Sequence, residues 1–172
     1  MEFWMNVLVV VLVFLAMSIW VAWSAIFGAP WVPTPRKKVR GMLEMAEVSP
    51  EDLLYDIGSG DGRILIMAAK EFGARCVGIE LDPLRVLWSR LAIRRWGLSQ
   101  RVLVLRENFF SSPIEHATVV TVYQGVGVNE RLEEKFSREL RPGTRVVSYR
   151  FLFKGLTQVK ADEKNSTYLY II

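Results

Sequence analysis

The hydrophobic pattern of the chain changes sharply near residue 30. The run from Phe3 to Phe27 holds no charged residue and is longer than the roughly 20 residues that a helix needs to cross a bilayer. Only Met1 and Glu2 precede the run. It therefore lacks the positive leading region and the shorter apolar core of a cleaved secretory signal. We expect a transmembrane anchor in residues 1–29.

The residues that flank this run suit a membrane protein whose remaining chain is cytoplasmic. The tryptophans near the two ends of the run are Trp4, Trp20, Trp23 and Trp31, and such rings favour the membrane interface. The stretch "RKKVR", Arg36–Arg40, carries four positive charges. Positive clusters stay on the cytoplasmic side and attract anionic lipids. A solvated linker without lipid contact is the alternative interpretation of this cluster.

Residues 30–50 are predicted to form a linker and a pre-domain helix. The stretch "GAPWVPTP", Gly28–Pro35, contains three prolines and should be stiff. Thr34 followed by Pro35 is typical of a helix start, with a capping hydroxyl before a proline at the first helical position. Apolar residues then recur at helical spacing from Val39 to Ala46.

From residue 51 to residue 172 the pattern alternates between strands and helices. Strands are predicted at 53–57, 74–81, 101–108, 117–123 and 144–151, and helices at 62–72, 83–96 and 129–140. Such alternation predicts an α/β fold of Rossmann-like type, with a parallel sheet and helices on both faces. Two last strands, 156–162 and 166–172, should form an antiparallel hairpin.

A few conspicuous residues are expected to carry no chemistry. Trp88 and Trp96 lie on the helix 83–96 and are expected in the core, as is the single cysteine, Cys76. His116 is the only histidine, so we expect neither a histidine-based metal site nor a Ser-His triad. The net charge of +4 is about that of the "RKKVR" cluster and does not indicate a nucleic-acid partner.

The stretch "YDIGSGDGRI", Tyr55–Ile64, is the strongest candidate for a ligand site. It places glycines between the first strand and the following helix, where Gly58 and Gly60 let a ligand approach the backbone. Glu80 ends the next strand, about 20 residues later. A carboxylate there can accept hydrogen bonds from both hydroxyls of a ribose. The combination predicts an adenosine-containing cofactor, and a tight turn without a ligand is the alternative.

The acidic residues around the turn indicate which cofactor it binds. The spacing is G-x-G-x-G with Asp56 before it and Asp61 within it, unlike the G-x-G-x-x-G of dinucleotide sites. Carboxylates are unfavourable beside a pyrophosphate but suit a cationic amino-acid end. S-adenosyl-L-methionine carries an ammonium and a sulfonium, and it is the cofactor that we expect. A NAD-linked enzyme is the weaker alternative.

The motifs "DIGSGDG" and "GIELDP" and the terminal hairpin resemble those of class I methyltransferases dependent on S-adenosyl-L-methionine. More narrowly, the chain resembles small archaeal protein-lysine methyltransferases and the mitochondrial membrane-anchored lysine methyltransferases that modify the ATP synthase c-ring protein and the adenine nucleotide translocase. The narrower resemblance rests on "VPTP", on "YDIGSGDGRI" and on "ATVVTVY…NERL…ELRPGTRVVSYRF". It implies a membrane-borne protein-lysine substrate.

The resemblance also implies roles for individual positions. The cofactor-binding residues would be Asp56, Gly58, Ser59 and Gly60 at the methionine end, Glu80 at the ribose, and Leu81, Asp82, Asn108 and Phe109 at the adenine. Thr34 and Pro35 would close over the site, and Tyr123 and Asn129 would flank the acceptor. Asn108 stands where many relatives have an acidic residue. The loop "QGVG" stands where relatives often have a proline-containing turn.

The resemblance implies a simple in-line methyl transfer in which the enzyme mainly aligns donor and acceptor. Tyr123 is the candidate for orienting a lysine amine, and a core aromatic at the sheet end is its alternative role. Two other functions stay open. One is methylation of a membrane-dissolved small molecule such as a quinone or lipid. The other is a non-catalytic membrane protein that binds the cofactor, to which the altered loop points.

Overall fold

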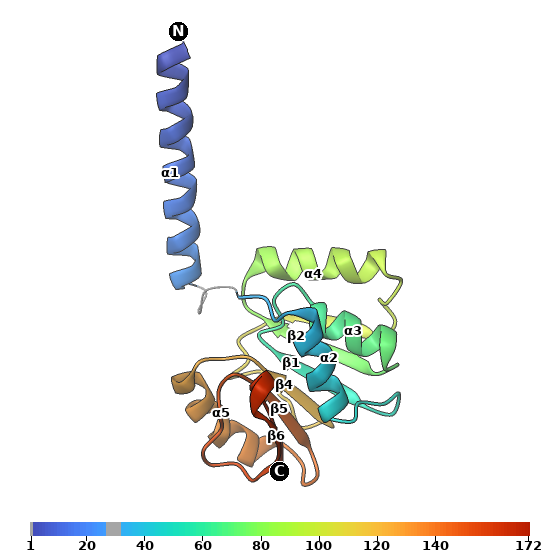
Figure 1. Ribbon diagram of the computed structural model, residues 1–172. Helices are drawn as coiled ribbons and strands as arrows, with labels where there is room; N and C mark the ends of the chain where they lie inside the picture. The colour runs from blue at the N-terminus through green and yellow to red at the C-terminus, as the bar shows by residue number, and fades with distance from the viewer. Residues whose placement is uncertain (1, 27–31) are drawn as a thin grey trace. The chain divides into compact units, whose positions relative to one another are not determined.

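The computed structural model describes residues 2–26 and 32–172, and the chain divides into two compact units, Met1–Val32 and Pro33–Ile172. The first unit holds helix α1, Glu2–Ile26 (Figure 1). Its span from Glu2 to Trp23 has a mean hydropathy of 2.6 and buries none of its residues in the protein. This helix is long and apolar enough to cross a membrane. Residues 28–31 of the predicted linker, with Trp31, lie outside the described residues.

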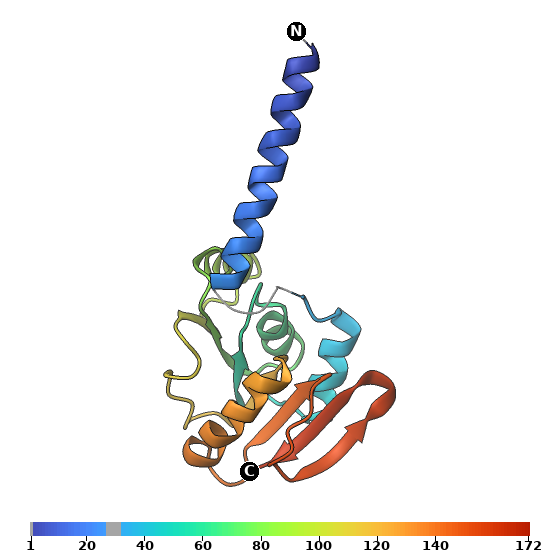
Figure 2. The same ribbon diagram turned by 90° about the vertical axis from the view of Figure 1, so that its left-hand side faces the viewer.

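The second unit is built on one seven-stranded sheet with the order β3-β2-β1-β4-β5-β7-β6. The strands are β1 (Leu53–Ile57), β2 (Arg75–Glu80), β3 (Val102–Arg106), β4 (Val119–Val122), β5 (Arg145–Tyr149), β6 (Gln158–Asp162) and β7 (Thr167–Ile171). The first five are parallel to one another, and β7 is antiparallel to both β5 and β6. The predicted hairpin is thus confirmed, and it forms the red end of the sheet in Figure 2.

Helices cover the two faces of the sheet and bury two separate cores (Figure 1). The helices are α2 (Arg36–Met45), α3 (Arg63–Glu71), α4 (Pro83–Arg95) and α5 (Val126–Glu139), and the short helix η1 (Glu163–Asn165) joins β6 to β7. Apolar residues of α2, α3 and α4 form one core with the sheet, and Leu132 and Phe136 of α5 belong to the other. Cys76 lies in the first core, as predicted.

Two helix starts differ from the prediction. Helix α2 begins at Arg36, and Pro35 occupies the capping position with an extended backbone and no side-chain capping hydrogen bond. Thr34 therefore does not cap this helix. Helix α5 begins at Val126, three residues before the predicted start at Asn129. Half of the "QGVG" stretch consequently belongs to the helix, which places Asn129 inside its first turn.

The expectation that Trp88 and Trp96 lie in the core is wrong. Trp88 is 69% exposed and Trp96 is 52% exposed, with the Lys70 Nζ 3.7 Å from the Trp96 ring centroid. Helix α4 buries Val86, Ser89 and Ile93 instead. Because α4 carries apolar residues on both sides, its sequence alone does not show which side packs on the sheet.

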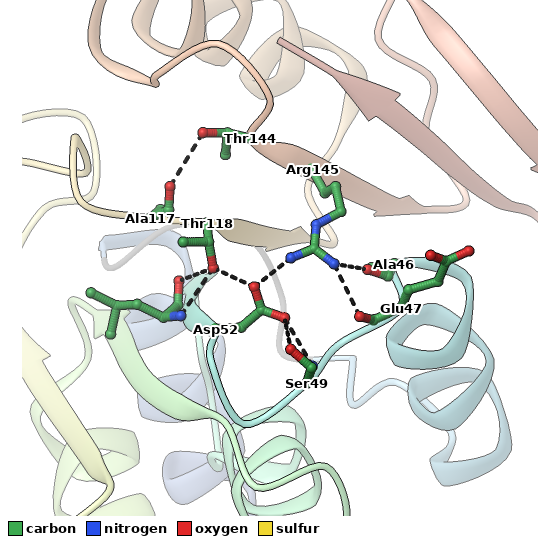
Figure 3. A network of polar contacts seen from close by, with 9 residues as sticks. Ala46, Glu47, Ser49, Asp52, Ala117, Thr118, Thr144 and Arg145 are labelled. Atoms are coloured by element: carbon green, nitrogen blue, oxygen red, sulfur yellow. Dashed lines mark hydrogen bonds and ion pairs between the residues drawn. The ribbon is translucent and has the colours of Figure 1, made fainter.

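Helix α2 is fastened to the sheet by an ion pair and backbone contacts (Figure 3). The Arg145 guanidinium on β5 donates to the carbonyl oxygens of Ala46 and Glu47, at 2.6 and 3.0 Å, and pairs with the buried Asp52 carboxylate. Asp52 also accepts hydrogen bonds from the Thr118 hydroxyl (2.7 Å) and the Ser49 amide (2.8 Å). The network joins the end of α2 to the beginning of β1, β4 and β5.

Candidate functional site

The glycine turn between β1 and α3 is shaped by left-handed backbone. Gly58, Gly60 and Gly62 have φ values of 78°, 55° and 77°, a conformation that glycine adopts without steric cost. The backbone amides of Gly58 and Ser59 both donate to the Ile79 carbonyl of β2, at 2.9 and 3.0 Å. The turn is therefore held at the carboxyl ends of the two central strands, where ligands of this fold class bind.

Glu80, the last residue of β2, lies against this turn. One carboxylate oxygen accepts a hydrogen bond from the Gly60 amide at 2.8 Å, and the other accepts from the Asp82 amide at 3.0 Å. The side chain is buried, and each oxygen keeps lone-pair capacity beyond its one backbone donor. A buried carboxylate in this position can accept hydrogen bonds from two neighbouring hydroxyls.

Asp56 supplies a second buried carboxyl, at the end of β1. It accepts a hydrogen bond of 2.7 Å from the Thr121 hydroxyl on β4. Burial, aided by the charges of Glu80 and Asp61, raises the pKa of Asp56 to about 7, although the Thr121 hydrogen bond opposes the shift. A cation placed beside Asp56 would favour the ionised form, so the site suits an ammonium group.

Two side chains at the turn fit a bound ligand. The buried Ser59 hydroxyl has no hydrogen-bond partner among the described residues, and such a group is normally satisfied. Gln124, after β4, donates to the Ile57 carbonyl at 3.1 Å. A Cβ on Gly58 would lie 2.2 Å from the Gln124 Nε2. The loop after β4 thus lies against the glycine turn.

The segment before α2 also reaches the turn. Thr34 is buried, and its carbonyl accepts a hydrogen bond of 2.9 Å from Arg63 at the start of α3. The same guanidinium forms an ion pair of 2.6 Å with Asp61 of the turn. Arg63 therefore joins Thr34 to the turn, and it brings the pre-domain segment to the predicted cofactor site.

The residues predicted at the adenine end lie on two loops. Leu81 is partly exposed, and Asp82 caps α4 by accepting hydrogen bonds from the Leu84 and Arg85 amides. Asn108 accepts a hydrogen bond from the Phe110 amide at 3.0 Å through its side-chain oxygen. The Phe109 and Phe110 rings lie 4.7 Å apart. The Asn108 amide nitrogen has no partner within the described ranges and remains a free donor.

An aromatic cluster lies at the ends of β4 and β5. The Tyr123 ring is 4.8 Å from that of Tyr149 and 6.2 Å from that of Phe151. Arg150, which has a left-handed backbone, donates to the Tyr123 hydroxyl at 3.3 Å. Since Val122 pairs with Ile57 in the sheet, Tyr123 leaves the sheet at the same edge as the glycine turn.

Asn129 of α5 approaches this cluster from the other side. Its side-chain nitrogen donates to the Phe151 carbonyl at 3.2 Å, and the Ser148 hydroxyl donates to the same carbonyl at 2.5 Å. Asn129 is 1% exposed, and its side-chain oxygen has no hydrogen-bond partner among the described residues. Tyr123 and Asn129 thus share Phe151 as a neighbour, and a buried acceptor is left free there.

Sequence reasoning missed three residues of this arrangement: Thr121, Gln124 and Arg63. Thr121 is the one polar residue in the strand "VVTV", and this interruption was a usable signal. Gln124 begins the loop that departs from the expected pattern. Arg63 follows the turn directly, but only the structure shows its contact with Thr34, 29 positions earlier in the chain.

Solved structures share this fold and contain the reaction product of the expected cofactor. The crystal structure of an RNA methyltransferase from Salinibacter ruber, in complex with S-adenosyl-L-homocysteine, is 42% identical with a TM-score of 0.77. The match covers 82% of this chain and 94% of that one. A methyltransferase from Geobacter sulfurreducens, at 23% identity and a TM-score of 0.60, covers 67% of this chain and 47% of its own and supports the fold alone.

Curated relatives agree in their reaction. A protein-lysine N-methyltransferase of Saccharolobus islandicus is 44% identical over 83% of this chain and 93% of the relative. The human lysine N-methyltransferase of the ATP synthase C protein is 34% identical over 74% of this chain and 54% of its own. The mouse adenine nucleotide translocase lysine N-methyltransferase is 36% identical over 71% and 53%. This chain spans about half the length of those two relatives.

The fold and the glycine turn define a class I methyltransferase, and its cofactor is S-adenosyl-L-methionine. The residues of the turn fit this group, since an unpaired serine hydroxyl and two buried carboxyls surround the glycines. Residues 56–160 match the family model of the ANTKMT methyltransferase domain, and the chain belongs to this family.

Proposed function

We propose that this methyltransferase transfers its methyl group to a lysine of a membrane-borne protein. The observation that carries the proposal is the free, buried oxygen of Asn129 beside the aromatic cluster of Tyr123, Tyr149 and Phe151. A buried acceptor can hold an N–H of a lysine amine, while aromatic side chains cover the alkyl stem. The names of the archaeal and mitochondrial relatives support a lysine acceptor.

The cofactor residues are proposed as a set. Asp56 and Ser59 hold the methionine end, and Gly58 and Gly60 admit it to the backbone. Glu80 binds the ribose hydroxyls. The adenine end is bound by residues of the two loops beyond β2 and β3, namely Leu81, Asp82, Asn108 and Phe109.

The bound cofactor supplies an electrophilic methyl group on its sulfonium. The chain's own residues must present an uncharged amine to it. Deprotonating a lysine with a pKa near 10.4 costs roughly 4–5 kcal/mol at neutral pH. The apolar rings of Tyr149 and Phe151 disfavour the charged ammonium and so reduce this cost. Asn129 and Tyr123 orient the amine, Thr34 closes the site beside Arg63, and the released proton passes to water.

Membrane anchoring by α1 is the second part of the proposal. The apolar span Glu2–Trp23 supports it, and so do the basic residues Arg36, Lys37, Lys38 and Arg40, which follow the span closely. Positive residues next to a span favour the cytoplasmic side. The methyltransferase unit is therefore proposed to be cytoplasmic and confined to the bilayer surface.

Labelling of membranes by the full chain tests the acceptor class. The protein is reconstituted in its native membranes with methyl-labelled cofactor, and protein, RNA and solvent-extractable lipid are then separated. We expect label on lysine, identified by mass spectrometry. RNA is included because the Salinibacter ruber neighbour is described as an RNA methyltransferase. Label confined to RNA or to lipid would refute the lysine assignment.

Two asparagine variants connect the result to the site. Asn129→Leu should keep cofactor affinity and lose most methyl transfer, because it removes the free acceptor near the amine. Asn165→Leu is the matched control, since Asn165 contacts Lys38 and Asp162, next to β6 and away from the glycine turn in sequence and contacts. Equal loss of transfer in both variants would contradict the role of Asn129.

A further inference from the structure

Helix α4 has an apolar face that packs against nothing in the domain. Leu84, Leu87, Trp88 and Leu91 are 64%, 56%, 69% and 55% exposed. Their spacing of i, i+3, i+4 and i+7 places them on one side of the helix. The buried residues Val86, Ser89 and Ile93 lie on the opposite side. The outer face of α4 is thus a continuous apolar stripe of four large side chains.

Basic residues border this stripe. Arg90 and Arg94 follow one edge of the stripe, Arg85 lies beyond the other edge, and Arg95 ends it. Pro83–Arg95 contains no acidic residue. Arg85 pairs with Asp82, and Arg90 donates to the Val104 carbonyl. Arg94 and Arg95 are exposed and have no ion-pair partner in the part of the chain that the structure describes. An apolar face flanked by arginines is typical of helices that lie in a membrane interface.

The first helix limits how far the domain can move from a bilayer. Residues 27–32 separate Ile26, the end of α1, from Pro33, the start of the second unit. A fully extended chain of this length spans at most roughly 25 Å, at about 3.6 Å per residue. If α1 crosses the membrane, the domain cannot leave the headgroup region by more than that distance. A surface that is held so close to lipid meets lipid more often than it meets any soluble partner.

We propose that the outer face of α4 lies in the bilayer interface, with Leu84, Leu87, Trp88 and Leu91 among the lipid chains and Arg94 and Arg95 at anionic headgroups. The proposal rests on the membrane anchoring proposed above, and it is independent of the identity of the methyl acceptor. Lipid is favoured over a protein partner because the stripe combines exposed leucine and tryptophan with arginine alone. Such a surface complements an anionic bilayer.

Docking of α4 would also orient the methyltransferase site. Helix α4 begins at Pro83, three positions after Glu80 and directly after its cap Asp82. A helix of 13 residues is about 20 Å long, at 1.5 Å per residue. The carboxyl edge of β2 would therefore be held within about one helix length of the headgroups. An acceptor lysine near the membrane surface would then be within reach.

A fluorescent label on α4 in the full chain tests the contact. The chain, with Cys76 replaced by serine, carries Leu91→Cys or Val159→Cys, labelled with an environment-sensitive dye and reconstituted in nanodiscs that contain anionic lipid. Val159 of β6 is the matched control because it is an exposed aliphatic residue, 53% accessible. We expect a blue-shifted emission and strong quenching by brominated lipid at residue 91, and neither at residue 159.

A charge variant separates the contact from other causes. Leu84→Glu with Leu87→Glu should remove most quenching at residue 91 while S-adenosyl-L-homocysteine still binds, which shows that the domain is folded. Equal signals at residues 91 and 159 in wild-type background would overturn the proposal. Burial of residue 91 only in discs with two copies would also overturn it, because the occupant would be a second chain. Failure of the chain to enter discs would instead refute anchoring by α1.

Discussion

Three carboxyl groups meet around the glycine turn, and Asp56 is the one whose ionisation is most sensitive to its surroundings. It is buried, and burial together with the charges of Glu80 and Asp61 raises its pKa to about 7. Ionised Asp56 favours a bound ammonium, whereas the protonated form does not. The affinity for the cofactor is thereby coupled to pH near neutrality.

The first prediction concerns this coupling. Affinity for S-adenosyl-L-homocysteine should rise by up to about tenfold per pH unit between pH 5 and pH 7 and then level off, because Asp56 must lose its proton to hold the ammonium. Asp56→Asn should lower affinity at pH 7 by roughly 10- to 100-fold, as expected for losing a charged hydrogen bond, and should remove the dependence. Calorimetry over this pH range measures both. A pH-independent wild type would refute the assignment.

The same pKa fixes the sign of a stability effect in the cofactor-free protein. Folding raises the pKa of Asp56 from 3.8 to about 7, so the folded state holds the proton more tightly. The contribution of this carboxyl to stability is fully present below about pH 4 and is lost as pH rises toward 7. Asp56→Asn should therefore flatten the decline of unfolding free energy over that range, which chemical denaturation at several pH values can measure.

A second prediction concerns the backbone of the turn. Gly58→Val should abolish cofactor binding, because its Cβ would collide with Gln124 and because its φ of 78° is unfavourable for valine. Gly97→Val is the control, since Gly97 has a φ of 69° and open space around its Cβ position. Thermal unfolding and cofactor titration of both variants separate backbone strain from loss of the site. Retained affinity in Gly58→Val would contradict the cradle.

At the scale of elements, α2 is connected to the rest of the domain by two ion pairs of different burial. Arg145 reaches Asp52, whose side chain is 5% exposed, and also satisfies two carbonyls at the end of α2 (Figure 3). Arg40 on α2 pairs with Glu71 on α3 at 2.5 Å, with side chains 49% and 33% exposed. Exposed pairs contribute little, whereas removing one partner of a buried pair leaves an uncompensated charge.

The third prediction follows from that difference. Arg145→Ala should lower the free energy of unfolding by roughly 3 kcal/mol, because Asp52 and the two carbonyls lose their donor. Arg40→Ala should change it by no more than about 1 kcal/mol. Urea denaturation of the two variants provides the comparison. Equal effects would show that the network around Asp52 does not hold α2 in place.

At the scale of the whole molecule, the two units divide the work. Both hydrophobic cores consist of residues from Val39 onward, and the cofactor cradle lies in the same unit. Helix α1 exposes its apolar side chains along the span. The first unit is thus available for the membrane while the second holds the chemistry.

The fourth prediction is that loss of residues 1–29 changes where the enzyme acts and not whether it acts. The shortened protein should bind S-adenosyl-L-methionine as before and methylate an accessible lysine peptide in solution. It should lose most methylation of its membrane-borne target, because the anchor raises the effective concentration of that target. Lysine methylation in cells that carry either form is compared by mass spectrometry. Full rescue by the shortened protein would contradict the role of α1.

The sequence by itself determined the order of elements, the position of the glycine turn and the pairing of that turn with Glu80. These features depend on local properties: strand and helix periodicity, the left-handed turn that glycine permits, and a spacing of about 20 residues between neighbouring strand ends. The hairpin of β6 and β7 was also predictable, from two strand-like runs joined by a short polar stretch. The cofactor class followed from the acidic residues around the turn.

Only the tertiary structure decided the features that depend on residues far apart in the chain. It joined Thr34 to Arg63, Asp56 to Thr121 and Asn129 to Phe151. It also turned Trp88 outward, although the sequence had suggested the core. Helix α4 is apolar on two sides, so periodicity cannot choose the buried side. That choice is made by which side fits the sheet, and packing against other elements is absent from any local pattern.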